Sequence, residues 1–185
     1  MDKLYIPVIL GTAREGRQSE KVARFVLGEA KQYGFKTELV DVKNFLFGHT
    51  GRMKYLAPAE QEKIKPWRDI VERADGFIVV SPEYNHGYPG ELKMLLDSLY
   101  QEYKRKPVAL CGVSGGPFGG ARMVEGLKLV FNELQMPVMR NAGYFGTVQN
   151  LFNDDGTIKD EAYKVRLKDV FDELLWYAKT LKANR

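Results

Sequence analysis

The strongest constraint on the fold of this chain is a regular alternation between short apolar runs and longer amphipathic segments. Runs such as Leu4–Leu10 and Gly76–Val80 are almost continuously hydrophobic, which is typical of strands buried on both faces of a parallel sheet. The segments between the runs carry apolar residues three and four positions apart, as in Ser19–Tyr33, and this spacing indicates helices with one apolar face. Because parallel neighbours need crossover helices, the pattern predicts an α/β fold with helices on both faces of a parallel sheet.

The alternation predicts five strands and five helices. Pro7 should distort the first strand, because proline has no N–H to donate to a ladder, and Gly34 should cap the first helix. No repeat, linker or low-complexity tract interrupts the pattern, so residues 1–185 are expected to form a single domain. The predicted strands are Leu4–Leu10, Lys36–Val42, Gly76–Val80, Pro107–Val113 and Met136–Arg140, and the predicted helices are Ser19–Tyr33, Pro58–Arg73, Pro89–Tyr100, Gly120–Leu134 and Asp160–Ala183.

Charge and composition narrow the classes of partner. A formal net charge of +4 suits an anionic small molecule, although a surface with a slight excess of solvated lysine explains it as well, and it is too small and dispersed to indicate nucleic acid. No apolar run is long enough for a membrane span, and no signal-peptide pattern is present. The single cysteine, Cys111, lies in an apolar run, which predicts a buried, inert thiol. We therefore expect a cytoplasmic protein without a metal site.

The loop after the first predicted strand has the composition of an anion site. Ligands of parallel sheets bind beyond the carboxyl ends of the strands, where the strand order reverses. Here Gly11–Ser19 offers the hydroxyls of Thr12 and Ser19 and the guanidinium groups of Arg14 and Arg17, just before a helix N-terminus that attracts negative charge. This set suits a phosphate monoester, although the loop has neither GxGxxG nor the GK[ST] of a P-loop. The alternative, a capping serine beside solvated arginines, stays open.

The loop after the third predicted strand reads SPEYNHGYPGELK, from Ser81 to Lys93. Its prolines stiffen the backbone and its glycines permit sharp turns. Between them, Glu83, Tyr84 and Asn85 offer a flat ring and hydrogen-bonding groups on which a planar polar heterocycle could stack. Two alternatives remain open: Glu83 could cap a helix or form a surface salt bridge, and His86 could simply face solvent.

The loop after the fourth predicted strand, Ser114–Arg122, has four glycines in six residues, so its backbone can approach a ligand closely. The chain has two histidines, no GxSxG elbow and no metal-spaced cluster, so no catalytic triad can be assembled. Three ligand-binding loops without acid–base machinery predict that a cofactor supplies the chemistry.

These three loops resemble those of the NADPH-dependent FMN reductases. Gly11–Arg14 with Ser19 resembles the GSxR…S phosphate loop of that family. Ser81–Asn85 with Pro89–Lys93 is similar to its PEYN…PGxLKNAID signature, and Ser114–Arg122 is similar to its third flavin loop. The resemblance extends from about residue 4 to residue 139. The chain departs from the family pattern in Thr12, where serine is commoner, in an extra basic run at Glu15–Arg17, and in Met94-Leu95 in place of Asn-Ala.

The resemblance implies a flavodoxin-like fold, a five-stranded parallel sheet of order 2-1-3-4-5, with non-covalently bound FMN. It also implies a homodimer or homotetramer. The residues that it implies for FMN binding are Thr12, Arg14, Gln18 and Ser19 for the phosphate, Pro82, Glu83, Tyr84 and Asn85 along the isoalloxazine, and backbone at Ser114, Gly115 and Gly116 near the pyrimidine edge.

The function that follows is that of an FMN-dependent NAD(P)H oxidoreductase. Hydride would pass from NAD(P)H to bound FMN and then to a quinone, azo compound, metal oxyanion or free flavin, and no residue is assigned as a proton donor. One alternative is a non-enzymatic, flavin-binding electron carrier, although the basic charge differs from the acidic character of flavodoxins. Another is a redox-sensing interaction protein that uses the aromatic and basic segment Asn44–Tyr55. That segment could instead form a rim for the nicotinamide dinucleotide, a subunit contact or a plain packed loop.

Overall fold

The computed structural model describes residues 3–46 and 51–185, and in this part of the chain five parallel strands form one sheet. The strands are β1 (Val8–Leu10), β2 (Leu39–Asp41), β3 (Phe77–Pro82), β4 (Val108–Val113) and β5 (Gly143–Phe145). The helices are α1 (Ser19–Tyr33), α2 (Pro58–Arg73), α3 (Gly90–Asp97), α4 (Ala121–Glu133) and α5 (Ala162–Lys182), with short 3₁₀ helices η1 (Val42–Phe45), η2 (Met53–Tyr55), η3 (Gln101–Tyr103) and η4 (Val148–Asn150).

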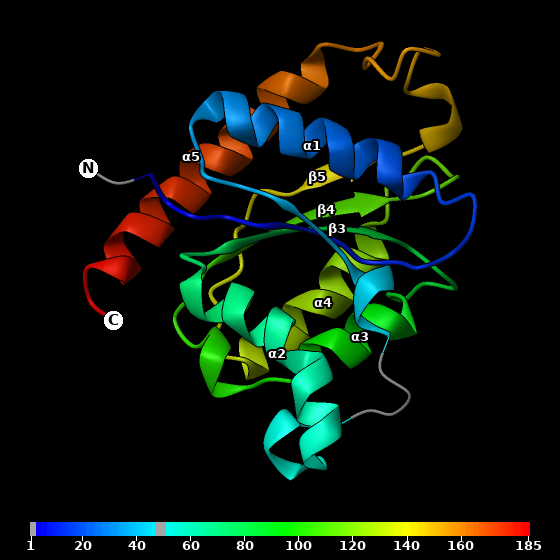
Figure 1. The fold of residues 1–185 in the computed structure, drawn as a ribbon. Coiled ribbons are helices and arrows are strands. Elements are labelled where there is room, and N and C mark those ends of the chain that lie inside the picture. The colour runs from blue at the N-terminus through cyan, green and yellow to red at the C-terminus, as the bar shows by residue number, and fades with distance from the viewer. Residues whose placement is uncertain (1–2, 47–50) are drawn as a thin grey trace.

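The strand order is β2-β1-β3-β4-β5, the predicted flavodoxin-like arrangement. Helices α1 and α5 cover one face of the sheet, and α2, α3 and α4 cover the other (Figure 1). Along β3, Ile78 and Val80 pack towards α1 and α5, whereas Phe77 and Val79 pack towards the other three helices. Every residue of β3 and β4 is buried, which explains why these strands are continuously apolar in sequence.

The ends of α1 and α2 coincide with the predicted ranges because their boundary residues act locally. Gly34 adopts a φ of 109° after α1, and its N–H donates to the carbonyl of Ala30. Helix α2 begins at Pro58, whose missing N–H costs nothing in a first turn. Helix α3 is shorter than predicted, since the hydroxyl of Ser98 donates to the Leu95 carbonyl (2.6 Å) and the chain turns there into η3.

The fifth strand lies elsewhere than predicted. The apolar range Met136–Arg140 is not a strand; within it only Val138 forms an isolated bridge, to the start of β4. The next backbone N–H groups, those of Arg140 and Asn141, donate to the carboxylate of Glu173 on α5 at 3.0 and 2.9 Å. The ladder with β4 therefore resumes only at β5, where three residues pair. The assignment of Met136–Arg140 as the fifth strand was therefore wrong.

The first strand shows the distortion expected at Pro7. Only Val8–Leu10 form the regular ladder with both neighbours, while Tyr5 makes an isolated bridge to Lys36. The thiol of Cys111 is buried as predicted, and burial raises its pKa to about 12. Among the described helices, none combines the length and apolar character needed to cross a membrane.

Candidate functional site

The predicted loops meet at the carboxyl ends of β1, β3 and β4, around a cavity of about 250 Å³. Three of the implied FMN-binding residues, Thr12, Asn85 and Gly116, do not line this cavity. Its lining comprises Arg14, Gly16, Arg17, Gln18, Ser19, Pro82, Glu83, Tyr84, Val113, Ser114, Gly115, Val148 and Gln149, which include the other eight implied residues.

The hydroxyl of Ser19 is the clearest sign of a ligand at this cavity. Ser19 is the first residue of α1 and is 2% exposed, yet its Oγ makes no hydrogen bond within the described ranges. A buried hydroxyl without a partner costs about 1–3 kcal/mol. The helix N-cap is Gln18, and no side chain caps it, so a merely capping Ser19 is not what the structure shows. A buried hydroxyl at the positive end of a helix fits a phosphate.

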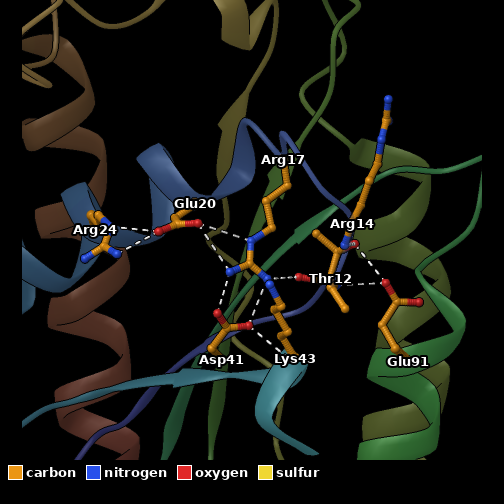
Figure 2. Close-up of polar contacts among 9 residues, drawn as sticks. Thr12, Arg14, Arg17, Glu20, Arg24, Asp41, Lys43 and Glu91 are labelled. Carbon is orange, nitrogen blue, oxygen red and sulfur yellow. Dashed lines mark hydrogen bonds and ion pairs between the residues drawn. The ribbon is translucent and has the colours of Figure 1, made fainter. Parts of the chain in front are cut away.

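The two arginines of the first loop have different environments (Figure 2). Arg17 is 9% exposed and is bound by two carboxylates: it donates to Asp41 at 2.8 Å and to Glu20 at 3.3 Å, and the hydrogen bond with Asp41 raises its pKa. Arg14 extends away from these carboxylates and forms no ion pair among the described residues. Its guanidinium lies 5.9 Å from the ring centre of Tyr84. Arg14 is thus the guanidinium of this loop that can bind an anion.

The hydroxyl of Thr12 is directed away from the cavity. Thr12 is fully buried and donates to Oε1 of Glu91 at 2.9 Å, on the first turn of α3. The backbone N–H of Ala13 donates to the same oxygen at 3.0 Å. The loop after β1 is therefore attached on one side to α3 and, through Arg17, on the other side to the edge strand β2 (Figure 2).

The second loop forms a tight turn beyond β3. Tyr84 and Gly87 exchange two backbone hydrogen bonds of 2.9 Å, and the residues between them, Asn85 and His86, have φ values of 50° and 66°. Positive φ at both central positions is that of a type I′ turn, and Asn and His are among the side chains that tolerate it best. Both side chains are exposed to solvent, so the solvent-facing alternative for His86 agrees with the structure.

Glu83 connects the second loop to the third. Its Oε2 accepts the backbone N–H groups of Arg122 (3.0 Å) and Met123 (3.4 Å), and its Oε1 forms an ion pair with the Arg122 side chain at 3.3 Å. A carboxylate in this position satisfies free N–H groups at the start of α4 and complements the helix dipole. The carboxylate is thus bound to α4, as the capping and salt-bridge alternative described.

The glycines of the third loop fall into two kinds. Gly119 has a φ of 61°, and its carbonyl would lie 2.4 Å from a Cβ added at Gly112, so these two positions require glycine for packing. A Cβ at Gly116 would meet nothing within 4 Å, and one at Gly115 only a side-chain oxygen at 4.0 Å. Gly115 and the neighbouring Ser114 line the cavity; Gly115 is exposed, whereas the Ser114 N–H donates to the Phe145 carbonyl at 3.1 Å.

The sequence analysis missed the contribution of the segment after β5. Val148 and Gln149 of η4 line the cavity, and the Gln149 amide donates to the Gly115 carbonyl at 3.3 Å. The signal was available in principle, because the loop after a fifth strand ends at the same edge of the sheet. The prediction considered only the loops after the first, third and fourth strands, and it placed the fifth strand too early, at Met136–Arg140.

The segment Asn44–Tyr55 can be placed only in part, because residues 47–50 lie outside the described ranges. The guanidinium of Arg52 stacks 4.0 Å from the ring centre of Tyr100, and the Met53 N–H donates to the Ser98 carbonyl at 2.7 Å. Arg52 and Met53 therefore pack at the C-terminal end of α3, whereas the Phe45 ring contacts Trp67 of α2. A larger cavity of about 550 Å³ lies there, between this segment and the C-terminal ends of α3 and α4.

The strand order is that of a flavodoxin-like protein, and the cavity whose residues suit a phosphate lies between β1 and β3, where the strand order reverses. Together they define a flavodoxin-like nucleotide-binding protein. More specifically, the chain belongs to the NADPH-dependent FMN reductase family, which it matches over residues 4–149. It is 35% identical over 139 residues to an NAD(P)H-dependent FMN reductase of Schizosaccharomyces pombe, covering 72% of this chain and 68% of that relative. It is 30% identical over 169 residues to a quinone reductase of Pseudomonas putida, covering 87% and 88%.

The fold agrees with solved structures of flavoenzymes. The flavoenzyme FerB of Paracoccus denitrificans, an NAD(P)H:acceptor oxidoreductase, superposes with a TM-score of 0.79 at 24% identity, covering 95% of this chain and 98% of that one. The predicted family, the flavodoxin-like fold and the expectation of an FMN-dependent NAD(P)H oxidoreductase are thereby confirmed. The cavity residues fit the phosphate of FMN, since the N-terminus of α1 meets there the Ser19 hydroxyl and the Arg14 guanidinium, which have no hydrogen-bond and no ion-pair partner, respectively, in the described part of the chain.

Proposed function

We propose that this oxidoreductase passes electrons from NAD(P)H to small acceptors, with quinones first and azo compounds, metal oxyanions and free flavins as further candidates. The observation that carries the proposal is the cavity at the carboxyl edge of the sheet. There the buried Ser19 hydroxyl has no partner among residues 3–46 and 51–185, and the surface beside Tyr84 leaves room for a planar molecule. The relationship to a quinone reductase supports the choice of acceptor.

The proposed arrangement distributes FMN over the three loops. Arg14, Gln18 and Ser19, with the N-terminus of α1, would hold the phosphate, and the chain at Pro82–Tyr84 would border the isoalloxazine. Bound FMN supplies the redox chemistry, since it takes up hydride from NAD(P)H and gives the electron pair to the acceptor. The exposed backbone at Gly115 would offer an N–H donor to the pyrimidine edge, where it favours negative charge on the ring, whereas the Ser114 N–H already donates to the Phe145 carbonyl at 3.1 Å.

The test is a steady-state comparison of NADH and NADPH as donors with a panel of acceptors: a benzoquinone, an azo dye, chromate and free FMN. The protein should purify yellow, release FMN on denaturation, and turn over the quinone with the highest kcat/KM of the panel. A protein that holds FMN yet transfers no electrons without a partner protein would instead support the electron-carrier alternative. Equal turnover of all acceptors would contradict the preference for quinones.

The oligomeric state and location are also proposals. A homodimer or homotetramer is supported by Leu129 on α4, which is 75% exposed next to the larger cavity between α3 and α4. Sedimentation at two protein concentrations would show a stable assembly, and a monomer at both would contradict this proposal. The single, buried Cys111 supports a reducing compartment such as the cytoplasm, which cell fractionation would test.

A further inference from the structure

The loop that would hold the FMN phosphate is itself held by a carboxylate from a different element. We propose that Glu91, in the first turn of α3, is the positioning residue that keeps this loop in its binding shape, and that Thr12 acts through Glu91 instead of contacting the phosphate. This inference rests on the proposed placement of the FMN phosphate at the loop after β1. It departs from the role that the resemblance implies for Thr12.

The geometry shows that one oxygen of Glu91 serves two donors of the loop. Oε1 accepts the hydroxyl of Thr12 at 2.9 Å and the backbone N–H of Ala13 at 3.0 Å (Figure 2). These donors lie 79 and 78 positions away from Glu91 in the sequence, so the contact joins the loop after β1 to the start of α3. The carboxylate thus binds the loop through two donors that do not line the cavity.

The hydrogen-bonding capacity of Thr12 is fully used by the protein. A threonine hydroxyl offers one proton and two lone pairs. The proton is donated to Glu91, and the oxygen accepts the N–H of Arg14 at 3.3 Å. The oxygen also lies 3.1 Å from the hydroxyl of Tyr84, which must then be the donor. With no capacity left, and no surface on the cavity, Thr12 connects α3, the phosphate loop and the second loop.

The charge state of Glu91 agrees with this role. Burial raises the pKa of its carboxyl, and the hydrogen bonds from the N–H of Ala13, the backbone of Glu91 itself and the Thr12 hydroxyl together more than offset that effect, so that the pKa is lowered overall. An ionised carboxylate accepts both donors but repels the phosphate of a nearby ligand. Any benefit of Glu91 to FMN binding must therefore come from the shape of the loop and not from its charge.

Because the charge of Glu91 opposes FMN binding while its hydrogen bonds support it, the two effects predict a definite order of FMN affinities among Glu91 variants. Glu91→Gln keeps an Oε1 that can accept both hydrogen bonds while it removes the charge, whereas Glu91→Ala removes both. The experiment measures the dissociation constants of FMN and of riboflavin, which lacks the phosphate, for both variants and the wild type. Glu72→Ala serves as the matched control. Glu72 is paired with Arg68 in the last turn of α2, just before the amino end of β3, whereas the cavity lies at the carboxyl ends of the strands.

We expect Glu91→Ala to weaken FMN binding by about tenfold, the scale of one charged hydrogen bond, with riboflavin binding within about twofold of the wild type. Glu91→Gln and the Glu72→Ala control should keep wild-type FMN affinity or, for Glu91→Gln, exceed it. A Glu91→Ala variant with an unchanged ratio of FMN to riboflavin affinity overturns the inference, and so does a Glu91→Gln variant as weak as Glu91→Ala. A general loss of structure would lower both affinities together, would leave this ratio unchanged and would thus also count against the inference.

A double-mutant cycle tests the part played by Thr12. If Thr12 acts through Glu91, Thr12→Val combined with Glu91→Gln should lose no more than about twofold in FMN affinity beyond Thr12→Val alone. Likewise, Thr12→Val combined with Glu91→Ala should bind FMN no more than about twofold more weakly than the weaker-binding of the two single variants. Losses that multiply would show a direct phosphate contact and overturn the proposal. A wild type that binds riboflavin as tightly as FMN would overturn the phosphate placement itself, an outcome separate from variants that leave an existing preference unchanged.

Discussion

Replacing Arg14 with alanine should separate cofactor binding from the stability of the apoprotein. Arg14 is exposed and forms no ion pair within the described ranges. The contact that it makes with a side chain is the 5.9 Å approach to the Tyr84 ring, and exposed contacts of this kind are worth about 0.5–1 kcal/mol. We therefore expect the free energy of unfolding of the apoprotein to fall by at most about 1 kcal/mol.

The effect of Arg14→Ala on FMN binding should be much larger. A guanidinium that donates a charged hydrogen bond to the phosphate contributes about 1.5–3 kcal/mol, which corresponds to a rise in Kd of roughly 10- to 150-fold. Quenching of FMN fluorescence on titration with the apoprotein measures this Kd at a fixed salt concentration, and riboflavin provides the ligand without the phosphate. An Arg14→Ala variant with wild-type FMN affinity, or with a parallel loss of riboflavin affinity, would refute the reasoning.

Arg17→Ala is the matched comparison, because it removes the other guanidinium of the same loop. Arg17 is 9% exposed and bound by Asp41 and Glu20, so its removal leaves partly buried carboxylates without their partner. The free energy of unfolding should fall by about 1–3 kcal/mol, as for other broken charged contacts, and urea denaturation of the apoprotein would show this. Equal stability losses in the two variants would contradict the difference seen between the two environments.

Three further changes give equally specific outcomes. Ser19→Ala should leave apoprotein stability unchanged or slightly higher, because it removes a buried hydroxyl that has no partner within the described ranges. The free energy of FMN binding should weaken by about 0.5–1.5 kcal/mol, and a clear loss of apoprotein stability would contradict this prediction. Glu83→Ala should lower the free energy of unfolding by about 1 kcal/mol, the usual value of a helix cap, and a urea midpoint equal to that of the wild type would exclude the capping role. Burial raises the pKa of Cys111 from its ordinary 9.0 to about 12, so the unfolded chain loses this proton first and stability should fall as pH rises from 9 to 12. Native protein should resist iodoacetamide at pH 9 and react only in denaturant, and a Cys111→Ala variant should show a flatter decline; rapid alkylation of the native thiol would disprove its burial.

The elements that could be predicted from sequence are those set by local chemistry. Helix α1 ends where Gly34 adopts a left-handed conformation, and α2 starts where Pro58 suits a first turn. The fifth strand was misplaced because its pairing depends on a distant residue: Glu173 takes the N–H groups of Arg140 and Asn141, and an apolar pattern carries no information on that contact.

The same limit applies to the candidate site. The residue types at the strand ends indicated a phosphate and a planar ring, because composition and position suffice for that inference. Side-chain partners across loops could not be predicted, as the attachment of Thr12 to Glu91 and of Glu83 to the start of α4 shows. Which of two arginines stays available to a ligand depends on Asp41 at the end of β2, which only the fold brings within reach of Arg17.

The bond between Arg17 and Asp41 also links cofactor exchange to the edge of the sheet. Arg17 donates both to the backbone carbonyl of Thr12 and to Asp41, so one side chain connects the loop after β1 to the three-residue strand β2. Edge strands are among the first elements to open in native-state fluctuations. We therefore expect local opening of β2 to limit the rate at which FMN dissociates. Hydrogen exchange at Leu39–Asp41 should slow when FMN is bound. In kinetic terms, an edge strand outside the pocket would set how long the pocket stays filled.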